Sequence, residues 1–111
     1  MDRKILAGYF EHIVLHPTAT MNEMQKGAQV AIENEVAAYC LKPHAVTDAK
    51  QWLAGSEVKL CTVIGFPHGT STVEIKVAEA ALAAKQGAEE VDMVINPSKA
   101  IEGDWDYFKR G

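Results

Sequence analysis

Short apolar runs alternate with helical patterns along the whole chain. Four of the runs have the length of a β-strand: residues 10–15, 35–41, 58–66 and 90–95. The stretches between them place apolar residues three and four positions apart, as at Met24, Ala28 and Ala31. We therefore predict a helix after each of the first three strands, and another helix from Asp104 onward.

The spacing of these elements predicts the direction of the strands. Helical segments of roughly 8–16 residues separate consecutive strands, and crossovers of this kind join parallel strands rather than hairpins. No linker or low-complexity tract interrupts the 111 residues. The pattern predicts an α/β fold of about four parallel β/α units, with residues 1–111 forming one domain.

Two helix starts carry a capping-box pattern, in which a hydroxyl and a glutamate three residues later satisfy free backbone amides. Thr20 and Glu23 form the first such pair, and Ser71 and Glu74 form the second. Gly87 is expected to end the Ala-rich helix that follows Ser71. Gly27 lies inside the first helix, where glycine is unfavourable, and nothing in the sequence accounts for it.

Composition narrows the classes of function. The net charge is −4 with 48% hydrophobic residues, so we expect neither nucleic-acid nor membrane binding. No apolar run approaches the ~20 residues of a membrane span. The two cysteines, Cys40 and Cys61, lie in strand-like runs and are expected to be buried free thiols, which fits a cytoplasmic protein.

Polar residues in or just after the strands are the candidates for chemistry, because ligands of parallel α/β folds bind at the carboxyl ends of the strands. Asp92 interrupts the apolar run 90–95, where a carboxylate is costly unless it is paired or used. It is predicted to be an acid/base group; the alternative is a carboxylate that bonds a neighbouring strand. Glu11 shares the face of Ile13 on the first strand, and could equally be a solvated strand-start residue.

Three further residue types have weaker signals. Lys42 follows Cys40 by two positions and could present a nucleophilic amine, although a solvated loop lysine is the simpler interpretation. Cys40 itself has no motif and is interpreted first as a core thiol. The four histidines lack a metal-ligand spacing such as HExxH, so we predict no metal site. They are His12, His16, His44 and His68.

Four blocks of the chain resemble the deoxyribose-phosphate aldolase family. Residues 58–72, VKLCTVIGFPHGTST, are similar to its VxTVIGFPxG block, and residues 74–80 to the helix that follows. Residues 90–96, EVDMVIN, resemble its E-V-D-M-V strand. Residues 10–17 and 40–43 resemble its opening I-D-H-T-L-L-K-P and its C-V-N-P segment. The blocks occur in the family's order and spacing.

This resemblance implies a (β/α) TIM barrel that cleaves 2-deoxyribose 5-phosphate to acetaldehyde and glyceraldehyde 3-phosphate. The reaction runs through a Schiff base on a lysine, without metal or other cofactor. Asp92 matches the family's proton-relay aspartate, and Cys40 matches its pocket cysteine. Glu11 stands where the family has aspartate, and Lys42 stands in place of asparagine, so both are assigned to the substrate pocket.

The resemblance also implies what the chain lacks. The family's Schiff-base lysine and its second lysine lie on the sixth and seventh strands, whereas this sequence has four strands, and a complete barrel needs about 200 residues. We therefore predict a partial TIM barrel, truncated before the catalytic lysines and inactive alone. The alternative is a non-catalytic half-barrel subunit or pseudoenzyme. Because its edge strands are unpaired, we expect a homo-oligomer whose small-molecule partner is a phosphorylated sugar or aldehyde.

Overall fold

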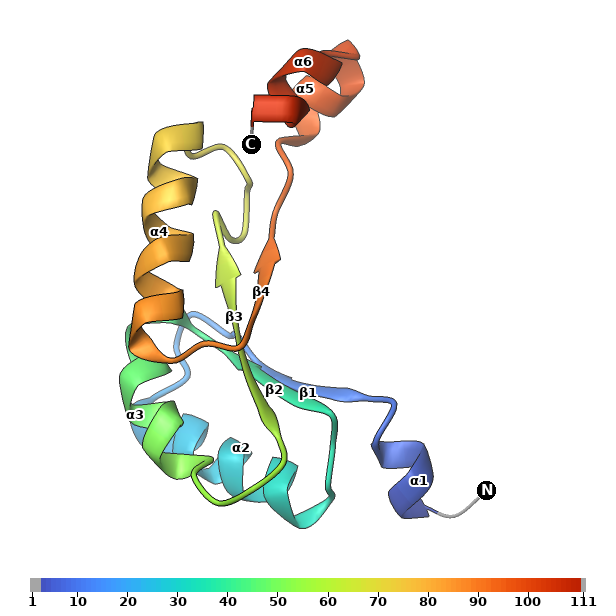
Figure 1. Ribbon diagram of the computed structural model, residues 1–111, viewed down its shortest axis with the longest axis vertical. Coiled ribbons are helices and arrows are strands. Elements are labelled where there is room, and N and C mark those ends of the chain that lie inside the picture. The colour runs from blue at the N-terminus through green and yellow to red at the C-terminus, as the bar shows by residue number, and fades with distance from the viewer. Residues whose placement is uncertain (1–2, 111) are drawn as a thin grey trace.

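The computed structural model describes residues 3–110, so residues 1, 2 and 111 of the predicted domain lie outside it. It contains a parallel sheet of four strands in the order β1-β2-β3-β4 (Figure 1). The strands are β1 (Glu11–Val14), β2 (Ala38–Leu41), β3 (Lys59–Ile64) and β4 (Glu90–Met93). The predicted α/β fold of four parallel β/α units is confirmed.

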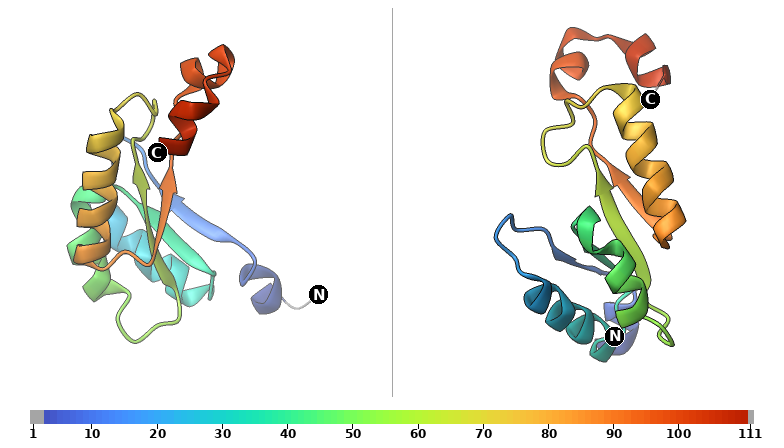
Figure 2. Two further views of the ribbon diagram at one scale, coloured as in Figure 1. Left: turned by 45° about the horizontal axis from the view of Figure 1, so that its top comes forward. Right: turned by 90° about the vertical axis from the view of Figure 1, so that its left-hand side faces the viewer.

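Helices α2 (Met21–Glu33), α3 (Val46–Trp52) and α4 (Val73–Gln86) connect the strands and cover one face of the sheet (Figure 2). A short 3-10 turn, η1 (Pro43–Ala45), precedes α3. Three further helices lie at the ends of the chain: α1 (Arg3–Ala7), α5 (Pro97–Glu102) and α6 (Trp105–Arg110). Helices α5 and α6 extend beyond the carboxyl end of β4 (Figure 1).

Alternation along the strands divides the buried residues into two clusters. Tyr39, Leu41 and Leu60 point toward the helices and pack with Met24 and Val46 in the main core. Cys40, Cys61 and Val63 occupy the intervening positions and form a small second cluster on the uncovered face, with Leu15 beside it. The sheet therefore has one covered apolar face and one face available for a site.

Helix starts and stops follow the predicted signals only in part. The Thr20 hydroxyl caps α2 by accepting a hydrogen bond from the Glu23 amide at 3.1 Å. The prediction of a second capping box at Ser71 and Glu74 is wrong. The N-cap of α4 is Thr72, one residue after Ser71, and its side chain makes no capping hydrogen bond. Gly87 ends α4 in the left-handed conformation at φ 116°, as predicted.

Gly27 owes its place in α2 to the sheet beneath it. The Tyr39 hydroxyl lies where a Cβ at position 27 would stand, and Val14 is 3.0 Å from that same point. The hydroxyl donates a hydrogen bond of 2.7 Å to the carbonyl of Met24. Glycine therefore lets α2 approach β2 closely enough for this buried bond to form.

The loop between β3 and α4 approaches the chain after β4 at Gly69. Its φ is +71°, and a Cβ there would overlap the carbonyl of Ile95. The Gly69 amide donates to the Gly65 carbonyl at 2.7 Å and closes the turn above β3, as the glycine and proline content predicts. This packing positions the carboxyl ends of β3 and β4 next to each other.

Candidate functional site

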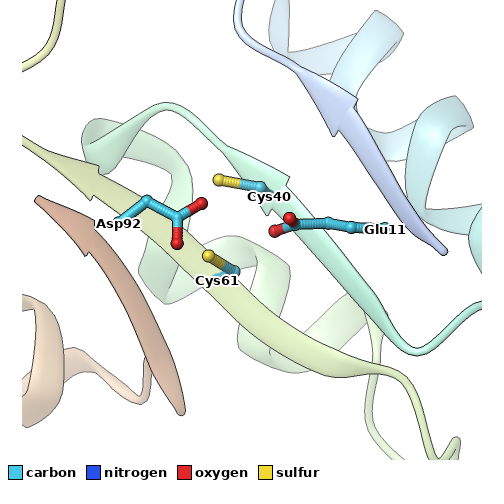
Figure 3. Close-up of side chains that lie close together, drawn as sticks. All are labelled: Glu11, Cys40, Cys61 and Asp92. Atoms are coloured by element: carbon cyan, nitrogen blue, oxygen red, sulfur yellow. The ribbon is translucent and has the colours of Figure 1, made fainter. Parts of the chain in front are cut away.

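Four side chains from four different strands meet on the uncovered face of the sheet. They are Glu11 of β1, Cys40 of β2, Cys61 of β3 and Asp92 of β4 (Figure 3). Their thiol sulfurs and carboxylate oxygens all lie within 4.8 Å of one another. We call this group the thiol–carboxylate cluster.

Strand register explains why these residues meet. Cys40 and Cys61 are direct partners across β2 and β3, so their side chains stand side by side. Asp92 is the partner of Val63, which lies two residues beyond Cys61 on the same face. Glu11 lies two residues before Ile13, the β1 partner of Cys40, and its longer side chain reaches toward the sulfurs (Figure 3).

The cluster consists of two buried cysteines and two exposed carboxylates. Cys40 and Cys61 are 1% and 0% exposed, whereas Glu11 and Asp92 are both exposed. Both cysteines are free thiols, as predicted. The carboxylates are therefore accessible to solvent, whereas the sulfurs are covered.

The environment of Cys61 keeps its thiol protonated. Its pKa is raised, chiefly by a hydrogen bond with Cys40 and by burial, and further by the charge of Cys40 and by the hydrogen bond and charge of Glu11. The sulfur also lies 3.6 Å from the carbonyl of Thr62, to which it donates. Because the thiolate is the nucleophilic form, Cys61 is not activated as a nucleophile in this state.

Lys42 lies outside the cluster. Its ammonium donates to the carbonyls of Ala19 at 2.8 Å and Pro17 at 3.3 Å, and so stabilises the loop between β1 and α2. The resemblance assigns Lys42 to the substrate pocket, and these two hydrogen bonds hold its ammonium against the loop. Lys42 also lines a pocket of about 430 Å³ at the carboxyl ends of the first three strands. The side chains around it include Leu15, Val63, Phe66 and Glu79.

Two features were not predicted as parts of a site. Cys61 was interpreted only as a buried thiol, although its alternation with Val63 already places it on the uncovered face. Lys76 is a buried lysine in α4, 5% exposed, whose ammonium donates to the carbonyl of Val94 at 3.0 Å. Its stem also lies 3.1 Å from the position of a Cβ on Gly65. Lys76 thus joins α4 to the carboxyl ends of β3 and β4, but nothing in a single lysine among alanines predicts that it is buried.

No helix within residues 3–110 is both long and apolar enough to cross a membrane. The successive β/α units, the helices on one face and the polar residues on the other are characteristic of the β/α-barrel class. The family model for the DeoC/LacD family aldolases matches residues 1–109. The chain belongs to this family.

Individual relatives agree with this assignment. Deoxyribose-phosphate aldolase of Malacoplasma penetrans is 45% identical over 107 residues, which cover 96% of this chain and 48% of that protein. The Deinococcus radiodurans enzyme of the same name is 44% identical over 101 residues, covering 91% of this chain and 46% of its own length. The chain thus spans about half the length of these curated relatives.

Solved structures show the same partial coverage. A candidate deoxyribose-phosphate aldolase from Coccidioides immitis superposes with a TM-score of 0.93 at 33% identity, covering 99% of this chain and 44% of that one. Deoxyribose phosphate aldolase from Aeropyrum pernix, described as a tetramer, superposes with a TM-score of 0.82 at 30% identity. The match covers 87% of this chain and 42% of that one. The four β/α units are therefore part of a TIM barrel, as predicted.

Proposed function

We propose that the chain supplies the amino-terminal half of the site of an aldolase that cleaves 2-deoxyribose 5-phosphate. The observation that carries the proposal is the position of Asp92, whose carboxylate lies on the uncovered face beside Cys40. The names of the relatives support the reaction. The alternative proposal is a non-catalytic half-barrel subunit. Such a subunit would have the same fold, but Asp92 would have no catalytic function in it.

Retro-aldol cleavage needs a group that moves protons while the carbon–carbon bond breaks. Asp92 is exposed and its carboxylate lies on the uncovered face, so a water molecule can contact both this carboxylate and a bound substrate. A positioned carboxylate of this kind contributes roughly 10²–10⁴-fold to rate as a general acid or base. In the proposal, Asp92 relays protons through such a water.

The covalent step needs a neutral lysine amine in addition. Two of the lysines that the structure describes have ammonium groups that are bound to backbone carbonyls. Lys42 is held by two loop carbonyls, and Lys76 by the carbonyl of Val94. We therefore propose that the amine comes from another segment of the complete site, and that these 111 residues alone form no Schiff base.

A chimera tests the contribution of this chain. Residues 1–109 replace the matched segment of the Malacoplasma penetrans aldolase, and release of glyceraldehyde 3-phosphate is followed in a coupled assay. We expect the chimera to be active and Asp92→Asn to reduce kcat by about 10²–10⁴-fold. Glu57→Gln, which changes an exposed loop carboxylate, is the matched control. A folded chimera without activity, or full activity in Asp92→Asn, would overturn the proposal.

Borohydride trapping tests the lysine argument. The 111-residue chain is incubated with acetaldehyde and borohydride, and adducts are located by mass spectrometry. We expect only the slow, scattered labelling of ordinary surface amines, which are protonated at neutral pH, and no change in Lys42→Ala. Rapid stoichiometric labelling of Lys42 would show that this residue has taken over the Schiff-base function.

We also propose that the chain associates with itself in the cytoplasm. Strands β1 and β4 each have one neighbour in the described sheet, and such edges favour pairing with another chain. The tetramer named for the Aeropyrum pernix relative supports association. The two free thiols fit a reducing compartment. A monomer by light scattering at micromolar concentration would count against self-association.

A further inference from the structure

The thiol–carboxylate cluster has more donor atoms than proton relay requires. A relay needs the Asp92 carboxylate, yet two sulfurs and a second carboxylate lie within 4.8 Å of it and of each other. Soft thiolates combined with carboxylate oxygens are a donor set that suits zinc and its heavier analogue cadmium. Magnesium and calcium ions are bound by oxygen ligands alone, so a site with two sulfur ligands suits neither ion.

The geometry of the cluster is close to what a four-coordinate ion needs. Tetrahedral zinc, with Zn–S near 2.3 Å and Zn–O near 2.1 Å, places its donor atoms about 3.3–3.8 Å apart. The cluster must therefore contract by roughly an ångström. Its two exposed carboxylates, on Glu11 and Asp92, can make that movement because neither is held by another hydrogen bond among those of residues 3–110. The cysteines, fixed on neighbouring strands, form the rigid half of the site.

We propose that Glu11, Cys40, Cys61 and Asp92 bind one thiophilic divalent cation of the zinc and cadmium class. Two metal–sulfur and two metal–oxygen bonds form, and the two thiol protons are released to solvent, with no change of oxidation state. Affinity therefore increases as the pH rises.

The proposed metal site shares Asp92 with the proposed aldolase site, but metal binding does not require aldolase activity. Bound metal would occupy the Asp92 carboxylate and so prevent it from relaying protons; the cation is thus an inhibitor rather than a cofactor. Spacing motifs could not reveal the site, because its four ligands come one from each strand and are separated by whole β/α units.

A cadmium titration of the 111-residue chain tests the proposal. The thiolate-to-cadmium charge-transfer absorbance reports sulfur ligation, and calorimetry in two buffers of different ionisation enthalpy reports stoichiometry and released protons. We expect one ion per chain and release of protons on binding. Asp92→Asn and Cys40→Ser should each weaken binding by at least about tenfold. Glu57→Gln should leave binding unchanged, because Glu57 lies in an exposed loop.

The variants separate the competing explanations. Asp92 is exposed, so Asp92→Asn keeps the protein folded even if a cysteine variant does not, and far-ultraviolet circular dichroism checks this. Absence of the charge-transfer band would overturn the proposal, as would cadmium binding that Asp92→Asn and Cys40→Ser leave unchanged, since that binding would belong to surface histidines. Metal binding is measured directly, so a failure here does not affect the chimera experiment.

Discussion

Replacing Gly27 by alanine should destabilise the protein, although the same change in an exposed helix stabilises it. Alanine is favoured over glycine within a helix by about 1 kcal/mol. Here the new methyl group would overlap the Tyr39 hydroxyl and crowd Val14. Tyr39 is completely buried and has packed neighbours on every side, so it can move away only by giving up its hydrogen bond to Met24.

The magnitude follows from that bond and from the crowding. Leaving buried polar groups unpaired costs about 1–3 kcal/mol, and overpacking a core costs a similar amount. After subtracting the gain in helix propensity, we expect Gly27→Ala to lower the free energy of unfolding by about 1–5 kcal/mol. For a domain of this size, that corresponds to a fall in Tm of roughly 4–8 °C for each kcal/mol.

Urea unfolding followed by circular dichroism and by tryptophan fluorescence measures the change. The decisive comparison is a double-mutant cycle with Tyr39→Phe, which removes the overlapping hydroxyl. Gly27→Ala should be less destabilising in the Tyr39→Phe background, with a coupling energy of about 1 kcal/mol or more. Additive effects, or a Gly27→Ala protein more stable than the parent, would refute this explanation of the glycine.

Three other outcomes are expected. Burial, and secondly the charge of Cys40, raise the pKa of Tyr39 from 10.0 to about 12, so the folded state holds more protons than the unfolded state in this range. Stability should therefore fall between pH 10 and 12, and Tyr39→Phe should flatten the pH dependence in unfolding experiments. Gly69→Ala should reduce Tm more than Gly55→Ala, because both glycines have positive φ but only Gly69 would place a Cβ against backbone; equal losses would contradict this. Lys76→Met should destabilise by about 1–3 kcal/mol by leaving a carbonyl unpaired, whereas Lys85→Met, exposed on the same helix, should change stability by less than about 0.5 kcal/mol in urea unfolding; equal effects would exclude the buried hydrogen bond as the cause.

The order and direction of the strands could be predicted because hydrophobic periodicity and crossover length are local properties. The residues at which the strands begin and end could not be predicted from these local properties. The apolar run of residues 35–41 extends three residues before β2, because strand length depends on where the neighbouring strand offers partners. Helix α5 was not among the predicted helices, yet the Asn96 side chain caps it by accepting a hydrogen bond from the Lys99 amide at 3.3 Å. An Asn-Pro pair both ends a strand and starts a helix.

A residue of the candidate site could be predicted where the pattern within a single strand was enough to identify it. Asp92 was identified because a carboxylate interrupts an apolar run, and the structure places it beside Cys40 and Glu11. Cys61 was not connected to them, since their proximity depends on the register between strands, which the sequence pattern leaves open. Lys42 follows the strand alternation, but its long side chain turns to carbonyls of a loop whose path is set by tertiary packing.

The strand order also bears on how the protein forms during synthesis. Each strand pairs with the strand that immediately precedes it in the chain, and the paired residues are between about 20 and 30 positions apart. Every new β/α unit can therefore dock on the unit before it as soon as it leaves the ribosome, without waiting for a later segment. During translation, the growing edge of the sheet is always the most recently made strand, and that strand, like β1 at the opposite edge, is exposed to non-productive pairing with other nascent chains.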